Sequence, residues 1–140
     1  MHSLDHELSI NASPQRVYRA LTTPDGLRGW FSTGSEGSGA PGTNWDMAFA
    51  GSSTRFIWEI TTSTPDTTVA WRCLEGPGDS PGTSVTFDLD QRNGGTLLRF
   101  SHSGWPHTEG NFVRCNTLWG GLLHRLADFA ETDRPSPLYN

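Results

Sequence analysis

His102 is the side chain of this sequence best suited to acid–base chemistry in a protein interior. It ends an alternating segment, residues 96–102, in which Leu98 and Phe100 lie on the same side. Because alternate side chains of a strand share a face, we expect His102 to point inward with them. A neutral imidazole there can donate to a ligand carbonyl or act as a general base, which makes His102 the one weak catalytic candidate. The alternative is a histidine that hydrogen-bonds the backbone of the turn after the strand.

Other catalytic and cofactor signatures are missing. All ten basic residues are arginine, so the sequence has no lysine for a Schiff base, a pyridoxal phosphate anchor or a Walker A motif. His2, Asp5 and His6 cluster near the start, and His102 and His107 are near one another in sequence. Neither group has a third ligand at a metal-binding spacing. We therefore expect no metal site and no cofactor.

Two further patterns favour ordinary structural roles. Residues 37–42 read GSGAPG and match the letters of the GxGxxG dinucleotide motif. That motif needs a strand before it and a helix after it, whereas here short helices precede it, a strand follows and a proline interrupts it, so we predict a flexible loop. Cys73 and Cys115 are too far apart for a CxxC redox pair and too few for a disulfide framework, so we expect free thiols.

Composition limits the class of protein and its partners. The chain has 140 residues, 15.4 kDa and a net charge of −5, which fits a single domain over residues 1–140 and disfavours nucleic acid as a partner. It has no apolar run of membrane-spanning length and no signal-peptide pattern, so membrane insertion is not expected and the expected location is cytoplasmic. Six tryptophans and seven phenylalanines are enough bulk to fill a core or to line a cavity.

The hydrophobic pattern divides the chain into strands and helices. A Ser-Pro pair at 13–14 and a Thr-Pro pair at 23–24 each predict the start of a short helix. Glycines and a proline make residues 32–44 a predicted loop. Apolar residues at three- and four-residue spacing predict a long helix over residues 110–131. Period-two patterns predict strands at residues 3–11, 45–49, 55–60, 69–74, 84–89 and 96–102.

These elements predict an α+β fold in which a curved six-stranded antiparallel sheet wraps around the long C-terminal helix. Two short helices follow the first strand. The single apolar stripe of the long helix must face the apolar side of the sheet. On the sheet, that side is expected to consist of Phe56, Trp58, Ile60, Val69, Trp71, Cys73, Val85, Phe87, Leu89, Leu98, Phe100 and His102.

Four stretches of the sequence resemble the START-like, or SRPBCC, helix-grip superfamily. They are residues 12–30 (ASPQRVYRALTTPDGLRGW), 82–89 (GTSVTFDL), 96–105 (TLLRFSHSGW) and 119–123 (WGGLL). The branch they resemble is that of the heat shock protein 90 ATPase activator C-terminal domain homologues. The resemblance implies a ligand cavity between the sheet and the C-terminal helix. We expect that cavity to be lined by Trp30, Trp58, Trp71, Phe100, His102, Trp105, Phe112 and Trp119, with Trp30 and Trp105 near its openings.

Three functions remain open at this point. The first is the binding of a small, largely apolar molecule, such as a lipid, in that cavity. The second is a cyclase-, aromatase- or hydrolase-like enzyme, for which the sequence offers His102 without an evident partner. The third is a co-chaperone-like module in the stress response, which the name of the branch suggests. An exposed edge strand, with Phe31 and Trp45 in loops, also leaves room for a homodimer.

Overall fold

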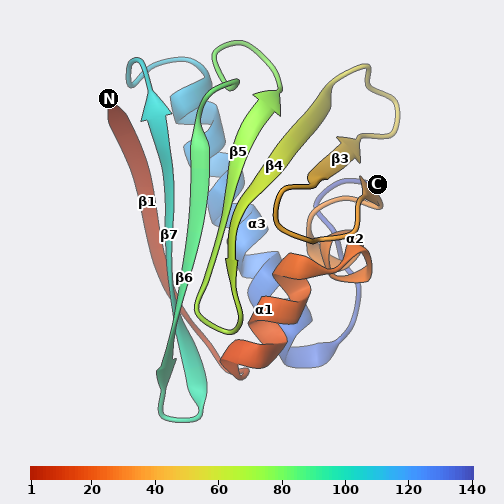
Figure 1. The fold of residues 1–140 in the computed structure, drawn as a ribbon, viewed down its shortest axis with the longest axis vertical. Helices are drawn as coiled ribbons and strands as arrows, with labels where there is room; N and C mark the ends of the chain where they lie inside the picture. Colours follow the sequence, from red (N-terminus) through yellow and green to blue (C-terminus); the bar gives the residue numbers. More distant parts are fainter.

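A curved antiparallel sheet with a long helix packed across one face makes up the computed structural model, which describes residues 1–140 (Figure 1). The strands are β1 (His2–Ile10), β2 (Gly34–Glu36), β3 (Asn44–Ala48), β4 (Arg55–Thr64), β5 (Thr68–Glu75), β6 (Ser84–Arg92) and β7 (Gly95–Trp105). The helices are α1 (Pro14–Thr22), α2 (Pro24–Trp30) and α3 (Asn111–Thr132). The α+β helix-grip architecture predicted from the sequence is confirmed. Among the helices, none combines the length and the apolar character that crossing a membrane requires.

The strands from β2 to β7 form an antiparallel meander, and the first strand, β1, pairs with the last, β7. The order of the sheet is β1-β7-β6-β5-β4-β3-β2, and every neighbouring pair is antiparallel. β1 therefore lies beside β7, far from it in sequence, with Leu8 opposite Leu98. Strands β1 and β2 form the two edges.

The sheet has seven strands, one more than the six predicted. The extra strand is β2, inside the predicted loop over residues 32–44. Its three residues pair with β3, and Ser35 is fully buried beneath the pair. Three residues are too few to produce a period-two hydrophobic signal, and a glycine and a serine provide two of them, so the pattern could not reveal this strand.

The two short helices begin where the Ser-Pro and Thr-Pro pairs predicted. Ser13 Oγ accepts a hydrogen bond from the Arg16 N–H at 3.3 Å, and Thr23 Oγ1 accepts one from the Gly26 N–H at 3.0 Å. Each hydroxyl satisfies a backbone donor that the first helical turn leaves free. The two helices then lie together against one end of α3 (Figure 1).

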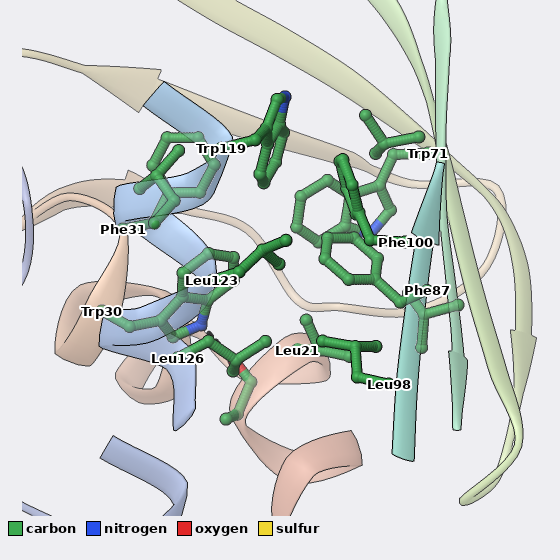
Figure 2. Close-up of a cluster of buried hydrophobic side chains, with 14 of the residues drawn as sticks. Leu21, Trp30, Phe31, Trp71, Phe87, Leu98, Phe100, Trp119, Leu123 and Leu126 are labelled. Carbon is green, nitrogen blue, oxygen red and sulfur yellow. Dashed lines mark hydrogen bonds between the residues drawn. The ribbon is translucent and has the colours of Figure 1, made fainter. Parts of the chain in front are cut away.

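The sheet and α3 share one hydrophobic core. The inward face predicted for the strands is confirmed, because all twelve of its members are buried except Phe56, which is half-buried. From α3, Trp119, Leu123 and Leu126 point toward the rings of Phe87 and Phe100 on the sheet (Figure 2). The long helix thus places its apolar stripe as its spacing required.

Candidate functional site

Most of the space between α3 and the sheet is filled by interlocking rings. The Phe100 and Trp119 ring centres are 4.4 Å apart, and those of Phe87 and Phe100 are 5.1 Å apart (Figure 2). Trp71 and Trp30 also pack against Phe87, with ring centres 5.1 Å and 6.4 Å from that of Phe87. Packing of this density leaves no room for a guest molecule in the centre of the fold.

A small hollow, here called the inner cavity, remains at one end of this core. Its volume is about 30 Å³, enough for a water molecule or two and far below a usual ligand site. The lining is almost entirely apolar. It consists of Phe31, Phe56, Trp58, His102, Cys115, Leu118, Trp119, Leu122 and Tyr139.

A larger hollow, here called the mouth pocket, lies next to the inner cavity. Its volume is about 390 Å³, which falls within the range of small-molecule sites. The lining comes from the first two turns of α3, from the chain between β3 and β4 with the start of β4, from the loop after β5 and from the C-terminal tail. It consists of Phe49, Ala50, Ser52, Thr54, Phe56, Pro77, Asn111, Arg114, Cys115, Leu118 and Tyr139.

The C-terminal tail is held beside the two hollows by backbone hydrogen bonds. The Tyr139 N–H donates to Phe31 O at 3.0 Å, and Asn140 O accepts from the Ala50 N–H at 2.8 Å, so the tail runs between α2 and the chain after β3. The Tyr139 ring packs on Phe49 with ring centres 4.7 Å apart. Burial raises the pKa of the Tyr139 hydroxyl. Tyr139 lines both hollows, as do Phe56, Cys115 and Leu118.

A third hollow of about 460 Å³ lies beside the mouth pocket and shares Thr54 and Pro77 with it. Leu74 is its single hydrophobic lining residue. A ligand there would bury little apolar surface, so this shallow hollow is the weaker site despite its size.

His102 lies at the bottom of the inner cavity with both ring nitrogens occupied. The Trp119 indole N–H donates to His102 Nδ1 at 3.0 Å. Since Nδ1 accepts, a neutral ring carries its proton on Nε2, which lies 2.8 Å from Thr83 Oγ1 and donates to it. The Thr83 hydroxyl in turn donates a hydrogen bond to Ser80 O at 2.6 Å. The result is a buried relay of hydrogen bonds in which every donor has an acceptor.

These hydrogen bonds and the burial of the ring determine whether His102 can take part in acid–base chemistry. Burial lowers its pKa from the usual 6.5 to about 3, because charging the ring here would strip its hydration. It is therefore neutral at physiological pH, with no lone pair free to take a proton from a ligand. Its partners are two side chains and not the backbone of the following turn, so the sequence-based alternative was wrong about the partner. The geometry makes His102 a link between β7 and α3.

Of the eight residues predicted to line a cavity, Trp58, His102 and Trp119 line the inner cavity. Trp30 is instead sealed in the core, where its indole N–H donates to Ala20 O at 2.9 Å. Trp105 is fully buried against His102, with ring centres 4.6 Å apart. The residues that belong to neither hollow are Trp30, Trp71, Phe100, Trp105 and Phe112.

The mouth pocket brings together residues that sequence reasoning missed. Leu118 follows Cys115 by three positions and precedes Leu122 by four, so helical spacing was the available signal for it. Tyr139 lies beyond the end of α3, in a short tail with two prolines that has no period of either kind. Phe49 and Arg114 carried no signal, because only the fold brings the chain after β3 beside the first turn of α3.

The two cysteines are free thiols, as predicted. Cys73 is buried and donates to Glu75 O at 3.3 Å, while Cys115 is half-buried and lines both hollows. Burial raises the pKa of Cys73 to about 12 and that of Cys115 to about 11. Both therefore stay protonated near neutral pH and are poor nucleophiles. No group of three or more His, Cys, Asp or Glu side chains is placed to hold a metal ion.

The two aromatic residues expected to support a homodimer do not lie on the surface. Phe31 and Trp45 are both buried within the monomer. Trp45 lies on β3 opposite Trp58, and Phe31 packs edge-on against Trp119 with ring centres 5.7 Å apart. Both rings belong to the core, so neither is available to a second copy.

Comparison with known proteins gives one family match. The family model of Activator of Hsp90 ATPase homolog 1-like protein matches residues 11–131. No curated protein matches the chain.

Several solved structures share the fold. The solution structure of the Aha1 dimer from Colwellia psychrerythraea has a TM-score of 0.85 and 34% identity, over 94% of this chain and 98% of that one. DynU16, a protein of the dynemicin biosynthetic locus, has a TM-score of 0.77 and 24% identity, over 95% of this chain and 48% of its own. CalU16 from Micromonospora echinospora has a TM-score of 0.74 and 24% identity, over 96% of this chain and 68% of its own.

Proposed function

The chain belongs to the Activator of Hsp90 ATPase homolog 1-like family, and from that premise we propose that it binds a small, largely apolar molecule in the mouth pocket. The observation that carries this proposal is the pocket itself, about 390 Å³ of space walled by Phe49, Phe56, Leu118 and Tyr139. A hollow of that size with ring and leucine walls gives a ligand buried apolar contact, and Ser52, Thr54, Asn111 and Arg114 add polar groups to the lining.

The inner cavity extends this site toward the core. It shares Phe56, Cys115, Leu118 and Tyr139 with the mouth pocket. The two hollows adjoin along these four residues. A ligand with a narrow apolar end then reaches Trp58 and Trp119, which line the inner cavity.

Binding is favoured over catalysis by the state of the titratable groups. An enzyme of the cyclase, aromatase or hydrolase kind needs an acid–base group within reach of its substrate. His102 is held neutral with both nitrogens engaged, and the Cys115 thiol has its pKa raised to about 11. Neither group is poised to transfer a proton or attack a substrate at neutral pH.

A filled-pocket variant tests the proposal. In Leu118→Trp a bulky ring occupies the mouth pocket, so ligands found by native mass spectrometry or thermal shift from a panel of aromatic and alkyl compounds should bind at least about tenfold more weakly. Val113→Trp is the matched control, because Val113 lies on the same stretch of α3 but is 55% exposed and lines neither hollow. It should bind as the unmodified protein does.

Two results would overturn the proposal. One is a panel in which no compound binds the unmodified protein. The other is equal binding by Leu118→Trp and Val113→Trp when both melt near the temperature of the unmodified protein, since the ligand would then lie elsewhere.

A further inference from the structure

The mouth pocket has one charged residue in its lining, Arg114. Its Nη1 donates to Asn111 Oδ1 at 2.8 Å, and the Asn111 amide in turn donates to Pro77 O at 3.0 Å. The guanidinium is therefore steered by an amide that is itself tied to the loop after β5. An arginine held in this way keeps its remaining N–H donors free for a partner.

No carboxylate of the protein pairs with Arg114. Other arginines do form such pairs, among them Arg16 with Asp133 and Arg99 with Glu7. Asp79, whose charge acts on the neighbouring Cys115, lies with its Oδ2 3.3 Å from His107 Nε2. Five of the ten arginines have no carboxylate partner, and Arg114 is the one of these five that lines the mouth pocket.

The rest of the pocket defines what that partner looks like. Phe49, Phe56 and Leu118 offer apolar surface to the body of a ligand, and Tyr139 adds its ring. A single guanidinium presents two parallel N–H groups that match the two oxygens of a carboxylate. A phosphate, which carries more charge, would meet a single cationic side chain here.

We propose that the ligand of the mouth pocket is a monocarboxylate with an aromatic or alkyl body, bound through its carboxylate by Arg114. This inference rests on the function proposed above and names the chemical class that the site selects. The apolar body lies against the rings and Leu118, and the carboxylate lies at the rim, where it keeps part of its hydration. The charge thus selects among ligands, while the apolar wall supplies contact.

Calorimetric titration with matched pairs of probes tests the inference. Hydrocinnamic acid is compared with its amide, and decanoic acid with decanol, so that each pair differs in charge but not in body. The unmodified protein should bind each acid about tenfold more tightly than its neutral counterpart, the size expected of one charge-assisted pair at a partly exposed site. Added salt should reduce that preference.

Variants at the arginine separate direct binding from general charge. Arg114→Gln should bind acids and neutral probes equally, and Arg114→Lys should retain part of the preference, because it keeps the charge but loses the two-pronged geometry. Arg134→Gln is the control, since it removes the same charge from a residue outside the pocket. It should leave the preference unchanged.

The outcomes distinguish this inference from the proposed function. If acids and neutral probes bind the unmodified protein equally, the pocket binds apolar molecules but the carboxylate assignment is wrong. If Arg114→Gln keeps the preference, or Arg134→Gln loses it to the same extent, Arg114 is not the binding group. If none of the four probes binds, the function proposed for the pocket fails together with the inference.

Discussion

The two halves of α3 pack against different surroundings. Toward its C-terminus, Leu122, Leu123 and Leu126 are buried, and α1 and α2 lie against this half of the helix (Figure 1). Toward its N-terminus, Cys115 and Leu118 are only half-buried, and a loop and the C-terminal tail are what face them. The mouth pocket therefore lies at the half of α3 that the two short helices do not cover. The C-terminal half of α3 stabilises the fold, and its N-terminal half is open.

The largest expected effect is a difference in stability between the two halves. Leu126→Ala removes a fully buried side chain and should lower the free energy of unfolding by about 2–5 kcal/mol. Leu118→Ala, at the wall of the mouth pocket, should cost about 1 kcal/mol, since less surface is buried there. Urea denaturation of both variants measures the difference. Equal losses would mean that the two halves are packed alike.

A second prediction concerns the pH dependence of stability. The folded pKa of His102, about 3, lies below its usual value of 6.5, so the unfolded chain takes up this proton first as the pH falls. The stabilisation from the neutral ring is complete above pH 6.5 and declines toward pH 3, by up to about 1.4 kcal/mol per pH unit.

His102→Gln isolates this contribution. Glutamine does not titrate, so the slope of unfolding free energy against pH should be flatter in the variant than in the unmodified protein on the acid side of 6.5. The comparison uses slopes and not absolute stabilities, so a general loss of stability in the variant does not disturb it. Parallel slopes would show that folding does not lower the pKa of His102.

The smallest expected effect is in thiol reactivity, which compares one cysteine from each region. Cys115 is half-buried in the lining of the mouth pocket, and Cys73 is buried on the inward face of β5. With a pKa of about 11, Cys115 should react with iodoacetamide more slowly than a free cysteine, and Cys73 should react only when the protein unfolds.

A bound ligand should slow the labelling of Cys115 further and leave that of Cys73 unchanged. Intact-mass spectrometry with peptide mapping follows the two sites separately. Faster labelling of Cys73 than of Cys115 would contradict the assignment of open and closed regions.

The sequence predicted the closed half of the molecule far better than the open half. Alternation on β6 and β7 and the spacing from Trp119 to Leu126 are repeating signals, so the face of each element could be assigned. The caps at Ser13 and Thr23 were equally clear, because each is a local hydrogen bond encoded within a few residues.

The candidate site lacked such signals. Whether bulky rings interlock or leave a gap depends on the exact placement of Trp30, Trp71 and Phe100, which periodicity does not encode. The mouth pocket joins Phe49 and Arg114 with Tyr139, residues that no local pattern relates. The resemblance to the helix-grip superfamily implied a cavity between sheet and helix, and the larger hollow instead lies at the end of that interface.

The most direct test of the account is to map a bound probe by NMR. Titration of isotope-labelled protein with hydrocinnamic acid should shift the backbone amide signals of Ala50, Cys115, Leu118 and Tyr139, which line the mouth pocket. The amides of Leu98 and Leu123 in the closed core should stay in place. Shifts centred on the core, with the mouth pocket unaffected, would contradict the claim that the ligand space lies at the N-terminal half of α3.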